Sequence, residues 1–210
     1  MISGDSKRRR RARLALLLLA IWISSALGAE GANPDGWNLN RLMQDLAQVK
    51  TARGRFVERK HLSILKTPLE FSGTLLYVAP DRLEKRTLNP HPESLVLERD
   101  VLTMEDGDRS RRRTLVLRDY PVVSVFVESI RSTLAGDLPT LARFYDVDLE
   151  GSEKEWRLTL TPVESKMRDV VSEIRIGGEG NWVSRVEVIE PGGNRSVMTV
   201  TRDSDPAPPR

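Results

Sequence analysis

The sequence contains no cysteine, and aromatic residues make up only 5% of its 210 residues. The absence of cysteine excludes disulfide bonds, thiolate metal sites and cysteine nucleophiles, so the fold must be stabilised by packing. Histidine is scarce too, because only His61 and His91 occur, both in polar, proline-flanked loops. A hydrolytic triad needs a serine beside an oriented base, and no serine here lies in a G-x-S-x-G motif. We therefore expect a protein that is not an enzyme and that uses no cofactor or metal.

Three acidic or glycine-rich segments could carry chemistry, but each has a simpler interpretation. The sequence "EDGD" (Glu105–Asp108) lacks the twelve-residue spacing and closing glutamate of a calcium-binding EF-hand, which favours a hairpin turn. Glu153, Glu155 and Glu164 could act as an acid and base pair on sugars, but the chain has few aromatic rings to stack a sugar. "GGEGNW" (Gly177–Trp182) lies between two expected strands and opens no helix, which favours a turn over a phosphate-binding loop.

The N-terminal segment has the order of a secretory signal peptide. Basic residues from Lys7 to Arg13 precede the apolar run Leu14–Ile23, and small residues follow in "SSALGAE". The ten residues of this run are about half of the roughly 20 needed to cross a bilayer, so cleavage is favoured over a retained anchor. We expect residues 1–28 to be a signal peptide cleaved after Gly28, with Ala26 as the second candidate, and the mature protein to be periplasmic.

Removal of residues 1–28 changes the charge of the chain. The whole chain has 33 basic and 30 acidic residues, of which this segment holds six and one, leaving 27 basic and 29 acidic residues, net −2. A nucleic-acid partner would need a basic surface that survives processing, and only "RSRRR" (Arg109–Arg113) offers a local candidate. We interpret this segment as a solvated strand end and expect no nucleic-acid partner.

About 180 residues remain after processing, which suits one domain with a sizeable core. We assign residues 29–36 to a linker and residues 37–202 to the domain. The tail 203–210 is polar and rich in proline, so we expect it to be disordered.

Apolar residues recur at helical spacing in two places. One stripe begins after Asn38, a suitable N-cap, and continues to Val49. Another lies between residues 119 and 136, with a proline near its start and a glycine at its end. A short further helix follows Asp137. The sequence thus predicts helices at the start and in the middle of the domain.

Elsewhere the period is two, as in "LEFSGTLLYV" (Leu69–Val78), where apolar and polar residues alternate. Seven further segments share this period and are separated by turn sequences such as "NPHP" and "PGGN". They are Leu95–Glu98, Leu102–Glu105, Leu115–Arg118, Trp156–Thr161, Ile174–Ile176, Arg185–Val188 and Met198–Val200. Short turns leave no room for crossover helices, which favours an antiparallel sheet over a parallel one. We therefore predict a mainly β fold with helices (α+β): an incomplete antiparallel β-barrel, made of one strongly curved sheet, under a helical lid.

The apolar face of this sheet must be covered, and two arrangements are open. The helices could pack against it as a solid core, or a cavity could remain between the two layers. Flexible aliphatic walls suit acyl chains, since each buried methylene contributes about 0.8 kcal/mol. A chain of some fourteen methylenes would gain on the order of 10 kcal/mol before the costs of ordering.

Several motifs of this chain resemble those of the LolA family, the periplasmic carriers of outer-membrane lipoproteins. They are the first amphipathic helix, "GRF" (Gly54–Phe56), "FSGTLLYVAPDRL" with Pro80, a second proline at Pro90, and "WRLTLTPV". The resemblance spans about residues 38–202. It implies an incomplete barrel with helices as a lid over a hydrophobic cavity, in a periplasmic protein that receives a lipid-bearing client.

Two positions depart from the family pattern. Ala79 stands where these carriers usually place a basic residue before the first proline, and Lys85 stands where they often have an aromatic residue. The cargo could accordingly be a lipoprotein or another lipid.

Our first hypothesis is therefore a monomeric carrier that binds acyl chains and shuttles its cargo between an inner-membrane donor and an outer-membrane acceptor protein. The cavity wall is assigned to Leu75, Tyr77, Leu83, Leu95, Leu97, Leu102, Met104, Leu115, Leu117, Leu158 and Leu160. The lid is assigned to Phe126, Ile130 and Leu134. Two alternatives are a sensor or interaction domain that binds an envelope protein without transport, and a hydrolase of lipid-linked substrates, which would need a positioned acid and base.

Overall fold

Eleven β-strands form one antiparallel sheet in the computed structural model, which describes residues 36–107 and 111–203. The strands are β1 Thr51–His61, β2 Leu69–Val78, β3 Arg82–Asn89, β4 Glu93–Glu98, β5 Val101–Asp106, β6 Arg111–Val116, β7 Tyr145–Ser152, β8 Glu155–Pro162, β9 Glu173–Glu179, β10 Trp182–Ile189 and β11 Arg195–Arg202. Their order is β6-β5-β4-β3-β2-β1-β11-β10-β9-β8-β7, so β1 joins the early strands to the late ones. The sheet has two edges, β6 and β7, and does not close. The predicted fold class is confirmed.

The terminal segments fall outside this description. The predicted signal peptide, the linker except Gly36 and the tail beyond Asp203 are not among the described residues. The chain from Trp37 onwards clusters as one unit. Among the helices of the described residues, none combines the length and the apolar character that a membrane span requires.

The strands follow the alternation seen in the sequence. In β1, Gly54, Phe56 and Glu58 are buried, while the intervening Arg55 and Val57 are exposed. Because successive side chains of a strand point to opposite faces, this pattern gives the sheet one inner and one outer surface.

The helices are α2 Leu39–Ala47, α3 Pro121–Ala135, α4 Leu138–Phe144 and the short α5 Ser165–Arg168. Asn38 caps α2, since its side chain accepts a hydrogen bond of 3.0 Å from the backbone N–H of Arg41. Gly136 ends α3 at φ 68°, and a Cβ there would lie 2.1 Å from the carbonyl oxygen of Met43. A glycine is therefore required by the left-handed backbone and by the close approach of α2.

Three details differ from the sequence prediction. Leu117 was assigned to a strand, but β6 ends at Val116 and Leu117–Asp119 form a 3-10 helix, η1, with Tyr120 N–H donating to the Leu117 carbonyl over 2.9 Å. The chain must leave the sheet there because Pro121 begins α3. The edge strand β7 was not among the strands expected from the sequence, and neither was α5.

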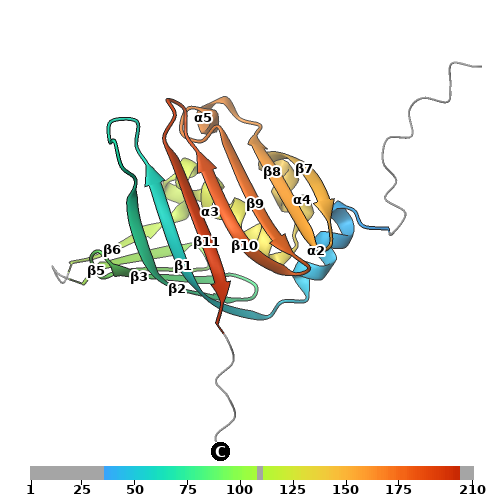
Figure 1. The fold of residues 1–210 in the computed structure, drawn as a ribbon, viewed down its shortest axis with the longest axis horizontal. Helices are drawn as coiled ribbons and strands as arrows, with labels where there is room; N and C mark the ends of the chain where they lie inside the picture. The colour runs from blue at the N-terminus through green and yellow to red at the C-terminus, as the bar shows by residue number, and fades with distance from the viewer. Residues whose placement is uncertain (1–35, 108–110, 204–210) are drawn as a thin grey trace, which may run out of the picture. The chain divides into compact units, whose positions relative to one another are not determined.

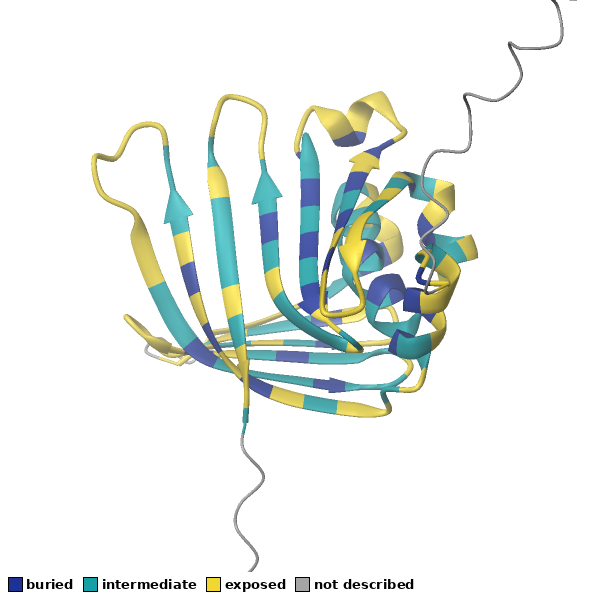
Figure 2. Ribbon diagram, turned by 45° about the vertical axis from the view of Figure 1, so that its right-hand side comes forward, coloured by how far each residue is buried: buried dark blue, intermediate teal, exposed yellow. Residues whose placement is uncertain are grey.

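The sheet is strongly curved, and α2, α3 and α4 lie on its inner side (Figure 1). Figure 2 shows the sheet bent into two arms with the helices beside it. A large core, which α2, α4 and part of α3 form with β8 and β9, contains Leu42, Leu46, Leu141, Trp156, Leu158, Leu160, Ile174 and Ile176 among its buried residues. A small core consists of Leu97, Leu102 and Leu117 with partly buried neighbours that include Val123 and Val127 of α3. Helix α3 thus packs against both arms.

Candidate functional site

A cavity of about 590 Å³ lies between α3 and the sheet, in the interval that the two cores leave between them. Its walls come from β1 to β5, from β10 and β11, and from α3. Among the lining residues, Ala52 and Gly54 of β1 are small, as is Thr133 of α3. At Gly54 the absence of a side chain allows close approach of neighbours, since a Cβ there would lie 2.9 Å from Val200 Cγ1 and 3.2 Å from the Trp182 ring.

The structure brings together part of the predicted wall and all of the predicted lid. The wall residues that line the cavity are Leu75, Tyr77, Leu83, Leu95, Leu97 and Leu102. The lid residues Phe126, Ile130 and Leu134 line it from α3, where their spacing of four residues places them on one helix face.

The other five predicted wall residues do not line this cavity. Leu158 and Leu160 are fully buried in the large core, beneath the helices. Leu117 is buried in the small core, and Met104 and Leu115 pack against it. The four that lie in strands share the inner face of the sheet with the cavity residues, and Leu117 follows β6 in η1, but other side chains of the protein already cover all five.

The opposite wall was missed in the sequence. It is formed by β10 and β11 through Val183, Val186, Val188, Met198 and Val200. The signal was present, because both segments alternate with period two, but only the register could show that β11 pairs with β1 and so faces the same cavity.

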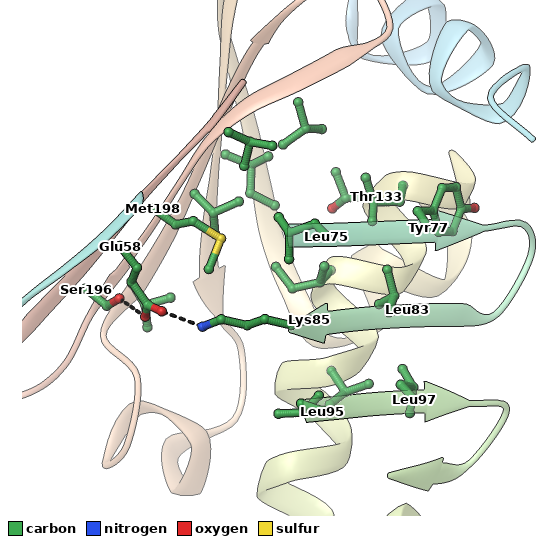
Figure 3. Close-up of a pocket in the computed structure, with 18 of the residues that line it drawn as sticks. Glu58, Leu75, Tyr77, Leu83, Lys85, Leu95, Leu97, Thr133, Ser196 and Met198 are labelled. Carbon is green, nitrogen blue, oxygen red and sulfur yellow. Dashed lines mark hydrogen bonds and ion pairs between the residues drawn. The ribbon is translucent and has the colours of Figure 1, made fainter. Parts of the chain in front are cut away.

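A polar cluster lies on this otherwise apolar surface. Lys85 Nζ of β3 donates a hydrogen bond to Oε2 of Glu58 on β1, and Ser196 Oγ of β11 donates to Oε1 over 2.6 Å (Figure 3). Lys60 Nζ is 3.6 Å from the same Oε1. Phe56 lies beneath Lys85, with the ring centroid 4.8 Å from Nζ. One carboxylate therefore holds groups from three strands.

The charge of Glu58 is stabilised by these partners. Its side chain is 7% exposed, and burial by itself raises the pKa of a carboxyl group. Hydrogen bonds from Lys85 and Ser196, with the charges of Lys85 and Lys60, outweigh burial and hold the pKa of Glu58 below its ordinary value. Glu58 is thus ionised at neutral pH.

Tyr77 contributes a buried hydroxyl group next to the cavity. Among the described residues, this hydroxyl has no hydrogen-bond partner. Burial, and to a smaller extent the charge of Asp81, raises the pKa of Tyr77, so the group stays protonated.

The part of the chain that the structure describes offers little to a metal ion. Within residues 36–107 and 111–203, no group of three histidine, cysteine, aspartate or glutamate side chains is arranged to hold one. His61 lies at the end of β1 and His91 in the exposed turn between β3 and β4. The arrangement suits binding of an apolar molecule.

A half-open antiparallel barrel with helices over a largely aliphatic cavity defines a binding protein. The family model of the LolA-like outer membrane lipoprotein carrier proteins matches residues 31–200, and the chain belongs to this family. The match indicates no catalytic family. No curated protein matches the sequence.

Similar solved structures are distant in sequence. A LolA superfamily protein from Nitrosomonas europaea is 9% identical, with a TM-score of 0.44 over 81% of this chain and 96% of that chain. A putative outer membrane lipoprotein-sorting protein domain from Vibrio parahaemolyticus is 9% identical, with a TM-score of 0.40 over 80% of this chain and 92% of that one. The matched chain of the Pseudomonas aeruginosa MucA/MucB complex is 16% identical, with a TM-score of 0.46 over 81% of this chain and 57% of that chain.

Proposed function

We propose that the protein is a periplasmic carrier that takes the acyl chains of a lipoprotein or another lipid into the cavity and shuttles this cargo between membranes. The observation that carries the proposal is the space of about 590 Å³ between α3 and the sheet, lined mainly by aliphatic side chains. Ligand sites in proteins typically measure roughly 300 to 1,000 Å³ and are mostly apolar. The cavity falls within this range.

The energetics favour a hydrocarbon guest. Each methylene moved from water into such a site contributes about 0.8 kcal/mol, and part of this gain is offset by the ordering of chain and protein. An acyl chain that is insoluble in water can thus travel inside a protein whose outer face is charged. An example of such surface charge is the ion pair in which Arg59 Nε lies 3.0 Å from Glu70 Oε2.

Helix α3 acts as the lid in this proposal. Its Phe126, Ile130 and Leu134 face the cavity. The hydroxyl of Tyr145 in β7 donates to the Val125 carbonyl over 3.3 Å and holds α3 to the arm of the sheet that contains β7, β8 and β9. A small shift of α3 away from the other arm would admit a chain.

Uptake of a fluorescent acyl probe by the purified mature protein tests the proposal. Ile130→Arg places a charge in the cavity and is expected to weaken uptake at least tenfold, because a buried unpaired charge costs several kcal/mol. Met198→Arg places a charge in the cavity from the opposite wall and is expected to weaken uptake to a similar extent. Val57→Arg, on the exposed outer face of β1, is the matched control and should leave uptake unchanged. Normal uptake by both cavity variants, with unchanged unfolding midpoints, would contradict the carrier proposal.

The cargo and the route need separate measurements. Mass spectrometry of organic extracts from protein purified from its native periplasm identifies the bound lipid. Transfer of that lipid between donor and acceptor vesicles then separates shuttling from storage.

A second candidate is an interaction domain that binds an envelope protein without transport. It is favoured by the loop between β1 and β2 and the first residue of β2, where Ile64 is 87% exposed and Leu65 and Leu69 are each 43% exposed. A stable protein partner that is captured without lipid, and lost in Ile64→Asp, would support this candidate over the carrier.

A further inference from the structure

The cavity is polarised along the strands. At one end, apolar side chains form a row that runs across β1 to β5. The register places Ala52 beside Tyr77, Tyr77 beside Leu83, Leu83 beside Leu97, and Leu97 beside Leu102. The other end lies near the β1–β2 loop, where Glu58 pairs with Met198 and Lys60 with Ser196. A hydrogen bond of 3.0 Å from the Ser63 backbone N–H to Asn194 Oδ1 ties this loop to the β10–β11 turn.

The charges at the second end do not cancel. Among the residues described, Glu58 is the one acid within ion-pair distance of Lys60 or Lys85. One carboxylate thus faces two ammonium groups, and the cluster carries a net charge of +1. The two ammonium groups together have six N–H donors, which is more than the roughly four acceptor sites of the shared carboxylate.

Both lysines are held in place. Lys85 lies over Phe56, and Lys60 lies over Phe71 at 5.0 Å from the ring centroid. Their side chains are 25% and 42% exposed, so a ligand in the cavity can reach them. Donors fixed beside an apolar wall bind an anion more strongly than the same groups in water.

We propose that this cluster selects amphiphiles with an anionic head, a phosphate or a carboxylate, which Lys60 and Lys85 bind while the hydrocarbon chain lies among Leu75, Leu83 and Ile130. Glu58 positions the lysines, and Ser196 holds Glu58. This inference rests on the proposed function of the cavity, since it names the class of ligand that the same site prefers.

The test compares ligands that share a dodecyl chain and differ in the head: dodecyl phosphate, dodecanoate, dodecanol and dodecyltrimethylammonium, each below its micelle concentration. Displacement of the fluorescent acyl probe gives the affinities. The two anions are expected to bind tenfold or more tightly than dodecanol, as charged hydrogen bonds allow, and the ammonium compound should bind more weakly than dodecanol. Equal affinities for the anions and dodecanol would overturn head-group selection and leave the carrier proposal standing.

Variants separate recognition from a structural ion pair. Lys85→Met should reduce dodecyl phosphate binding to the level of dodecanol, whose own affinity stays unchanged. Glu58→Gln should increase the preference for phosphate, because it removes the competing negative charge. A purely structural pair would lower stability in both variants without altering the ratio of affinities. If the Lys85→Met variant folds poorly, the variant Glu58→Gln/Lys60→Met/Lys85→Met, whose cluster has neither a carboxylate nor an ammonium group, must lose the preference.

Two further outcomes distinguish the sources of failure. If none of the four dodecyl compounds displaces the probe and the probe itself does not bind, the carrier proposal fails, and this inference with it. Inorganic phosphate at millimolar concentration should not displace the probe. If inorganic phosphate displaced the probe as effectively as dodecyl phosphate, the cluster would be a site for the free anion, and the proposal that it selects amphiphiles would be wrong.

Discussion

The two arms of the sheet have the same alternating sequence pattern but different interiors. In the arm of β8 and β9, Leu158, Leu160 and Ile174 are fully buried under α2 and α4. In the arm of β2 and β3, Leu75 and Leu83 are only partly buried and line the cavity. Both sets of side chains point inward, so the position of the helices decides which arm is solid and which is hollow.

Polar residues follow the same division. The inner faces of β8 and β9 carry Trp156, Leu158, Leu160, Ile174 and Ile176 in the large core. The hollow arm carries Glu58, Lys60 and Lys85 on its inner face. A charge is costly in a dry, packed core unless it is fully paired, whereas a cavity that reaches solvent tolerates one. Charged inner positions therefore mark the hollow arm.

The largest expected effect compares one leucine from each arm. Leu160→Ala should lower the free energy of unfolding by about 4 kcal/mol, because the large core cannot close over the lost atoms. Leu75→Ala should lower it by only about 1 kcal/mol, since Leu75 already borders empty space. Urea titrations of both variants measure the difference. Equal losses would mean that the two arms are equally packed.

A smaller effect concerns the ion pair of the hollow arm. Lys85→Met should lower the free energy of unfolding by about 3 kcal/mol at pH 7, because it leaves the Glu58 carboxylate buried without its main partner.

The effect of Lys85→Met should also depend on pH. In the wild type, the pKa of Glu58 lies below its ordinary value of 4.5, so its stabilising contribution is present above pH 4.5 and is lost as the pH falls through the folded-state pKa. The difference in free energy of unfolding between wild type and variant should accordingly become smaller below about pH 4.5. Unfolding midpoints at pH 7 and pH 3.5 check this, with Val57→Met as control. If this difference did not depend on pH, the variant would have lost packing contacts and not the interaction between charges.

The smallest effect is expected at Tyr77. Its buried hydroxyl lacks a partner among the described residues, and removal of such a group relieves a desolvation cost. Tyr77→Phe should raise the free energy of unfolding by about 1 kcal/mol. Chemical denaturation measures the change, and a destabilised variant would show that the hydroxyl is bonded.

Much of the fold could be predicted from local patterns. The cap at Asn38, the break at Gly136 and the strand alternation each depend on neighbours in the chain, and all three appear as expected. The end of β6 was misjudged because Leu115 and Leu117 keep the alternation while Pro121 requires the chain to turn.

The candidate site was only partly visible. The lid residues of α3 followed from helical spacing, and the leucines of β2 to β5 from alternation. Leu158 and Leu160 obey the same rule as Leu75, and no local signal shows that α2 and α4 cover them. The wall formed by β11 required knowledge of its pairing with β1.

By itself, the sequence determined which segments become strands or helices and which side chains face inward, because these properties depend on residues a few positions apart. It also excluded cysteine chemistry. The tertiary structure alone decided where the interior stays hollow and which charges meet there. Glu58 lies 27 residues from Lys85 and 138 residues from Ser196 in the chain. Only the curvature and register of the whole sheet bring these three side chains to one cavity.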